Sequence, residues 1–404
     1  MANVSSSNGL EKRPKLRFPG FDDPYRTITL GQIASLVNRT DPTSNAPIMM
    51  LSAGNGFIMQ SEKYSRDNAG QSLKKYILLK KGELAYNHGA SKAKQYGCCY
   101  ELTENEARIP YVYHCFKISG TEHTPYVATA LNNPKIDRQL KRLVSSSVRM
   151  DGLLNISFDD YMSVILHLPS LKEQTHIADF LKKLDERITS QEKLVASLKK
   201  YKRGLLHDVL SEKIKITTET WTEHRIGEFL HSKSIKQLPT TDAPLMAFTA
   251  TGGVCDKGER YDRGFLVKDA SSKLYKRTDL NDFIYSSNNL DVGSIGLNLY
   301  GSAVISDVYE IFSIKDADPW FISEAIKQKP IMSRILKYRQ GCLYGQYRIY
   351  AEDFLGVFVK IPSYEAQKKI GAVFSKIDGK ITQEQILLDC LEKARTFFLQ
   401  QLFI

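Results

Sequence analysis

The sequence predicts an α+β fold in which a strand-rich globular part followed by a long helix occurs twice. Of its 404 residues, 42% are hydrophobic and 25% charged, so the chain can bury the cores of two or three domains. The segment that begins at Pro169 recurs from Pro362, 193 residues later. In both copies apolar residues recur at alternating steps of three and four, which is typical of a long amphipathic helix.

The duplication extends over most of the chain. At the offset of 193 residues, Gln174 matches Gln367 and Asp185 matches Asp378. Further upstream the offset between matching segments rises to 199 residues, as loops of different length would cause. We therefore predict a first globular domain over residues 1–168, a helix over 169–212, a second globular domain over 213–361 and a second helix over 362–404.

The two helical segments carry a heptad seam, and about 40 residues would form a rod of roughly 60 Å. An apolar seam needs a partner, and two like helices that follow two like domains are expected to pair as an antiparallel coiled coil. Polar Gln191 and Glu384, near the middle of the seams, would fix its register. The alternative is that each helix packs only on its own globular domain. The predicted pairing positions are Ile177, Leu181, Leu184, Ile188, Gln191, Leu198, Ile370, Ile377, Ile381, Glu384 and Leu391.

The globular domains contain short runs rich in β-branched and aromatic residues, such as 76–79, 109–113 and 282–285. Gly, Asn and Ser clusters separate these runs, which is typical of strands joined by turns. Segments 126–142 and 321–337 are predicted to be helical. Each globular domain is therefore expected to be a mixture of short strands and one or two helices.

The sequence contains none of the motifs that mark common catalytic or metal sites. It has no phosphate-binding P-loop, no G-x-S-x-G elbow and no H-E-x-x-H pair, and its six cysteines form no C-x-x-C pair. The one nuclease-like triplet, Asp378-Gly379-Lys380, lies inside a predicted helix. No apolar run approaches the ~18 residues of a membrane span. We expect a cytoplasmic chain without catalytic residues, metal or cofactor of its own.

Lys and Arg exceed Asp and Glu by 56 to 45, giving a net charge of +11, and basic residues alternate with aromatics and amides in several predicted loops. Lys and Arg neutralise phosphates, while Arg, Asn and Gln bind base edges in the major groove of DNA. Any single charged loop is more often simply exposed to solvent than bound to DNA. Here, however, such loops recur at matching places in both copies. The candidate DNA-binding residues are Lys63, Tyr64, Arg66, Ser91, Lys92, Lys94, Arg149, Lys257, Arg260, Tyr261, Arg263, Asn288, Asn289, Tyr344 and Gln346.

The segment 168–188, LPSLKEQTHIADFLKKLDERI, closely resembles the central conserved region of type I restriction–modification specificity subunits. Its second copy, 361–381, lies where that family has its distal conserved region, and 15–21 resembles the family's usual start. The second copy departs from the first at 371–373, where Gly-Ala-Val replaces Ala-Asp-Phe.

The resemblance implies that each globular domain is a target recognition domain for one half of a split, asymmetric site on double-stranded DNA. The paired helices would set the half-site spacing and dock two methyltransferase subunits, with restriction/translocase subunits joining through them. S-adenosylmethionine, ATP and Mg would bind in those partners, in a bacterial or archaeal cytoplasm. Two other classes remain open: a protein-interaction scaffold that reads no DNA, and a nuclease fused to such domains.

Overall fold

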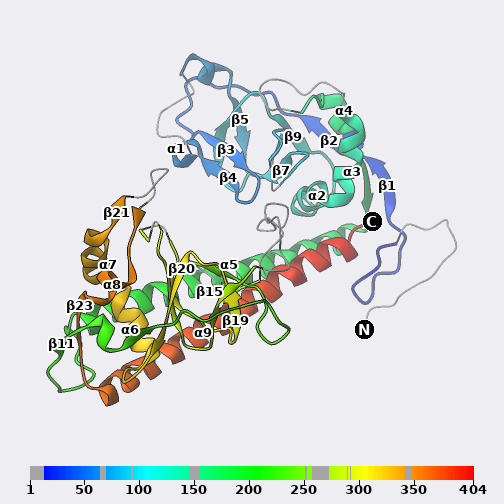
Figure 1. The fold of residues 1–404 in the computed structure, drawn as a ribbon. Coiled ribbons are helices and arrows are strands. Elements are labelled where there is room, and N and C mark those ends of the chain that lie inside the picture. Colours follow the sequence, from blue (N-terminus) through cyan, green and yellow to red (C-terminus); the bar gives the residue numbers. More distant parts are fainter. Residues whose placement is uncertain are drawn as a thin grey trace. The chain divides into compact units, whose positions relative to one another are not determined.

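Most of the strands and helices recur in the same order in the two halves of the chain, and each half ends in a long helix (Figure 1). The computed structural model describes residues 13–63, 70–91, 94–144, 154–250, 253–256, 273–288, 290–291, 293–341 and 347–404. Two units divide the chain, the first comprising Met1–Glu192 with Leu387–Ile404 and the second Lys193–Ile386.

The first unit is built on a four-stranded antiparallel sheet with small two-stranded pairs beside it. The sheet has the order β2 (Ala34–Leu36), β9 (His114–Ile118), β6 (Leu84–Asn87) and β7 (Cys98–Glu101). The antiparallel pairs are β1 (Arg26–Thr29) with β10 (Ile165–Leu168), β3 (Met49–Ser52) with β4 (Gly56–Met59), and β5 (Ile77–Lys80) with β8 (Glu106–Ile109). Its short helices are η1 (Leu30–Gln32), α1 (Gln60–Lys63), η2 (Gly70–Lys75), α2 (Thr124–Leu131), α3 (Pro134–Leu143) and α4 (Phe158–Met162).

The second unit repeats this plan. Its four-stranded sheet has the order β12 (Leu230–Ser232), β20 (Tyr309–Ile314), β17 (Phe283–Ser286) and β18 (Ile295–Leu297). Beside it lie β11 (Thr222–Arg225) with β23 (Phe358–Ile361), β14 (Ala247–Thr249) with β15 (Gly253–Cys255), and β13 (Lys236–Gln237), β16 (Tyr275–Thr278) and β19 (Ala303–Ile305). Its further elements are η3 (Ile226–Glu228), α6 (Pro319–Ile326), α7 (Lys329–Ile335), η6 (Leu336–Tyr338), β21 (Gln340–Gly341), β22 (Tyr347–Arg348) and α8 (Ala351–Leu355). The predicted α+β duplication is confirmed.

Two long helices, α5 (Leu171–Leu210) and α9 (Tyr364–Gln401), pack against each other in antiparallel fashion. In the first unit, Arg395 of α9 binds Asp185 of α5, with Nη2 3.2 Å from Oδ2. In the second unit the roles are exchanged, and Lys202 Nζ of α5 lies 2.7 Å from Asp378 Oδ2 of α9. The two ion pairs are the same contact in the two copies. They explain why both seams carry a cation at this position.

The predicted pairing positions are all at least half-buried. Ile177, Leu181, Ile188, Gln191 and Ile370 are buried, and Leu184, Leu198, Ile377, Ile381, Glu384 and Leu391 are half-buried. Glu384 forms an ion pair 2.5 Å long with Lys380, one turn earlier on the same helix. The antiparallel helix pair that the seams predict is thus confirmed.

Each globular core also includes side chains from both long helices. In the first unit, Ile177 and Leu181 of α5 join Leu402 and Phe403, which directly follow α9, in one buried cluster, and Phe398 of α9 packs against it. In the second unit, Leu206 and Val209 of α5 and Ile370 and Phe374 of α9 do the same. The helices therefore pack on the globular domains as well as on each other.

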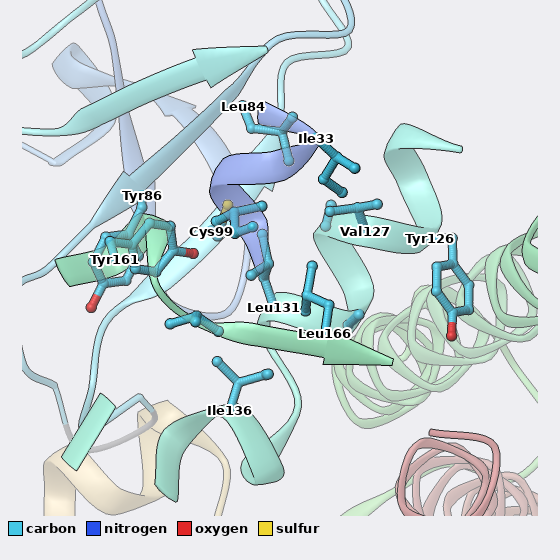
Figure 2. Close-up of a cluster of buried hydrophobic side chains, with 14 of the residues drawn as sticks. Ile33, Leu84, Tyr86, Cys99, Tyr126, Val127, Leu131, Ile136, Tyr161 and Leu166 are labelled. Carbon is cyan, nitrogen blue, oxygen red and sulfur yellow. The ribbon is translucent and has the colours of Figure 1, made fainter. Parts of the chain in front are cut away.

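Stacked aromatic rings lie at the centre of both cores. Tyr86 and Tyr161 lie face to face (Figure 2). Their ring centroids are 3.8 Å apart, and the angle between the ring planes is 6°. Tyr285 and Phe354 form the equivalent pair in the second unit, at 4.4 Å. Stacked pairs of this kind add specific geometry to the large apolar area that the rings bury.

Candidate nucleic-acid interface

Most predicted DNA-binding residues lie outside the described ranges of the chain. These are Tyr64, Arg66, Lys92, Arg149, Lys257, Arg260, Tyr261, Arg263, Asn289, Tyr344 and Gln346. Lys63 is the last residue of α1. Only Ser91, Lys94 and Asn288 can be placed together with their hydrogen bonds. For all fifteen residues, DNA contact stays a prediction.

Ser91 and Lys94 lie in the loop between β6 and β7 and hold that loop in shape. The Lys94 amide donates to Ser91 Oγ at 3.0 Å, and its ammonium donates to the Asn132 carbonyl oxygen, just after α2, at 2.7 Å. The loop closes at Gly97, whose φ of +84° favours glycine; a Cβ there would lie 2.8 Å from the Tyr86 ring. These bonds give Ser91 and Lys94 a structural role in the loop.

Asn288 lies beside a two-stranded ribbon of the second unit. It forms an isolated antiparallel bridge with Arg348, and its carbonyl oxygen accepts a hydrogen bond from Ser286 Oγ at 2.9 Å. The ribbon consists of β21 and β22, with Gln340 opposite Arg348 and Gly341 opposite Tyr347. The structure therefore brings Asn288 together with Arg348 of this ribbon.

The ribbon and its flanks expose aromatic rings with guanidinium groups over them. Tyr338, Tyr347 and Tyr350 are 46%, 46% and 45% exposed. Arg339 lies over the Tyr347 ring at 5.1 Å, and Arg348 lies over the Tyr350 ring at 5.0 Å. Arg348 Nη2 also lies 3.5 Å from Glu310 Oε1, which leaves Arg339 as the more available of the two cations.

This ribbon has the chemistry of a DNA-reading element. A two-stranded ribbon fits the major groove, an Arg fork binds guanine, and tyrosine hydroxyls contact phosphates. The residue choice made from sequence took Tyr344 and Gln346 from this segment and passed over Arg339 and Tyr347. The alternation of Arg and Tyr around Gly341 and Gly345 in the sequence was the available signal.

The first unit exposes a smaller group of the same type. Tyr111, in the turn between β8 and β9, is 50% exposed, and the Lys75 ammonium lies 5.8 Å from its ring centroid. Lys74 and Lys75 are both exposed at the last turn of η2. This group lies just before β9, the counterpart of β20, and so at a different place in the repeat from the ribbon. The segment of the first unit that matches the ribbon at the offset of 193, residues 147–155, lies mostly outside the described residues.

The buried thiols show no sign of nucleophilic chemistry. Burial raises the pKa of Cys98 to about 11 and that of Cys115 to about 12, and it raises the pKa of Cys99 further, so all three stay protonated at neutral pH. Across the described ranges, no three His, Cys, Asp or Glu side chains are grouped closely enough to hold a metal ion. No helix within those ranges is long and apolar enough to cross a membrane.

Solved structures share this fold. The S subunit of a type I restriction-modification system from M. genitalium matches 97% of this chain and 99% of its own, with 16% identity and a TM-score of 0.61. A second match is a chain from a structure on complex assembly and conformational transition of the type I R-M system. It covers 94% of this chain and 97% of its own length, with 14% identity and a TM-score of 0.50. No protein-family model matches this chain, and no curated protein does. The predicted resemblance is confirmed at the level of the fold.

Proposed function

We propose that this chain is the DNA-recognition subunit of a type I restriction-modification complex, and that each globular domain reads one half of a split DNA site. The observation that carries the proposal is the duplicated fold, which the M. genitalium S subunit shares over nearly its full length. The basic and aromatic groups exposed on each unit support the DNA contact. Because the loops of the two halves differ in sequence, the two half-sites are expected to differ as well.

The helix pair is proposed to set the half-site spacing and to dock partner subunits. Each helix exposes large apolar side chains: Leu194 and Tyr201 on α5 are 42% and 60% exposed, and Ile386 and Phe397 on α9 are 58% and 51% exposed. Exposed apolar groups on a rod are candidates for protein contact. The proposed partners are two methyltransferase subunits, which would bind S-adenosylmethionine, and restriction/translocase subunits, which would use ATP and Mg.

The test is a base-resolution methylation map of DNA exposed to this chain and its cognate methyltransferase subunit, with this chain omitted as control. A new split motif methylated on adenine would support the proposal. If the complex assembles and leaves no mark, the DNA-reading role is wrong, and a protein-interaction scaffold remains. Binding should also weaken steeply as salt rises, since phosphate contacts release counterions.

A matched pair of variants tests the ribbon. Arg339→Ala should weaken recognition by about 1–3 kcal/mol, as expected for the loss of an Arg contact to a base, and should relax specificity in one half-site only. Arg225→Ala is the control, because Arg225 is also exposed and also lies over a ring, 5.4 Å from Phe358, but is outside the ribbon. Equal effects of the two variants would argue against DNA reading by the ribbon.

A further inference from the structure

Two buried glutamines lie where the long helices begin. Gln174 is in the first turns of α5 and Gln367 in the first turns of α9, and they are 0% and 2% exposed. They occupy the same position in the two copies, each five residues after a proline. A buried amide on a helix has to satisfy both its donor and its acceptor.

Both glutamines make the same pair of hydrogen bonds. Gln174 Nε2 donates to the Pro169 carbonyl oxygen at 3.0 Å, and its Oε1 accepts from the His123 amide at 3.0 Å. Gln367 Nε2 donates to the Pro362 carbonyl oxygen at 2.9 Å, and its Oε1 accepts from the Asp318 amide at 3.0 Å. The two units thus build the same hydrogen-bond arrangement from different neighbouring residues, which indicates that the fold requires this contact.

These bonds join three segments of each unit. Pro169 and Pro362 directly follow the strands β10 and β23 and lie two residues before the first residue of each long helix. His123 and Asp318 are the residues before α2 and α6, the helices that contact strands β7 and β18 of the four-stranded sheets. The glutamine amide thus holds the start of the long helix to the helix that covers the sheet.

We propose that Gln174 and Gln367 are positioning residues that fix each globular domain on its long helix, and so limit the half-site separations that the protein accepts. This inference rests on the proposed function. Neither glutamine is exposed, so neither can contact DNA itself. The effect of each glutamine on recognition has to act through the orientation of its globular domain.

The two joints are reinforced to different extents. In the first unit, Arg17 makes a two-pronged ion pair with the fully buried Glu173, with Nε–Oε1 at 2.9 Å and Nη2–Oε2 at 2.7 Å. The Gln174 amide also donates to Glu122 at 2.5 Å. The position equivalent to Glu173 in the second copy is Ala366. The second joint therefore depends more on its glutamine than the first.

The experiment compares Gln174→Met and Gln367→Met in the assembled methyltransferase complex. Methionine keeps the length of the side chain but removes both hydrogen bonds. Gln383→Met is the matched control, because Gln383 is exposed on the same helix as Gln367. Methylation is measured on duplexes with the natural gap and with the gap one base pair shorter or longer, and hydrogen exchange of the His123 and Asp318 amides reports the joint directly.

The wild type should prefer the natural gap. Gln367→Met should reduce that preference about tenfold, which is within the range expected for the loss of its two buried hydrogen bonds, while methylation at the natural gap changes much less. Gln174→Met should act in the same direction but more weakly, and each variant should speed exchange only at its own joint.

Unchanged gap preference in Gln367→Met, despite faster exchange of the Asp318 amide, would overturn the inference. A uniform loss of methylation at every gap length would overturn it as well, because it would indicate a purely structural role. If the wild-type complex methylates no split site, the proposed function fails first.

Discussion

Gly371 of α9 lies against the residue that caps α6, and replacing it with alanine tests that contact. An alanine Cβ at 371 would lie 3.1 Å from Asp318 Cγ and closer still to Oδ1. Asp318 Oδ1 accepts the Phe321 amide at 2.8 Å and so caps the helix. In the first copy, Ala178 takes the place of Gly371, and His123 takes the place of Asp318. The His123 side chain does not cap its helix. The departure of the second copy at 371 therefore makes room for a capping carboxylate.

Gly371→Ala changes two opposing contributions to stability. Replacing a helical glycine by alanine usually stabilises by about 1 kcal/mol. Displacing the capping carboxylate costs about 1 kcal/mol, within a range of roughly 0.5–2, and the crowding adds to that cost. We expect Gly371→Ala to be neutral or to destabilise by up to about 1 kcal/mol. At Gly379 on the same helix nothing lies within 4 Å of the position that an alanine Cβ would take, so Gly379→Ala should stabilise by about 1 kcal/mol.

The assay is urea unfolding followed by tryptophan fluorescence. Trp221 and Trp320 are the only tryptophans of the chain, and both lie in the second unit, so the signal reports that unit alone. In an Asp318→Ala background, which removes the carboxylate, Gly371→Ala should become stabilising. If Gly371→Ala stabilises the wild type as much as Gly379→Ala does, the reasoning about the cap is wrong.

Three further predictions concern single side chains. Asp378→Asn should cost about 0.5–1 kcal/mol in the same fluorescence assay, because its partner Lys202 is only partly shielded from water, and the cost should shrink at high salt. Burial lowers the pKa of His114 below its usual 6.5, so the unfolded chain binds this proton more tightly and the first unit loses stability as pH falls below about 6.5. Between pH 7.5 and pH 5.5, the unfolding temperature should fall less in His114→Gln than in the wild type. Tyr161→Phe should be nearly neutral, since the second unit has Phe354 at this position, whereas Tyr161→Ala should cost about 3–5 kcal/mol in thermal unfolding.

The features predicted from sequence were those carried by periodicity and repetition. The heptad seams identified α5 and α9 because apolar spacing follows directly from the geometry of a helix. The polar seam positions Lys202 and Arg395 were visible as a shared break, but their partners were not. Asp185 and Asp378 lie on the opposite helix, and only the antiparallel register brings each to its cation.

The candidate interface was harder to predict because loop geometry decides which side chains are exposed. The sequence context of Lys94 predicts DNA contact, but it does not show that the ammonium also donates to the Asn132 carbonyl oxygen. Arg339 and Tyr347 become neighbours only when β21 and β22 pair, which depends on a register that no periodicity signals. Direct contacts to bases depend on a few such side chains, so the sequence could indicate regions and not individual residues.

The core of the first unit combines residues from distant stretches of the chain, and this has a consequence for synthesis. The cluster that contains Ile177 and Leu181 also contains Leu402 and Phe403, and the Leu16 amide donates to the Gln401 carbonyl oxygen at 3.1 Å. The second unit is one continuous stretch, Lys193–Ile386. On the ribosome, the second unit can therefore complete its core before the first, although the first is translated earlier. A premature stop codon near residue 400 would damage the N-terminal half of the protein rather than the C-terminal half.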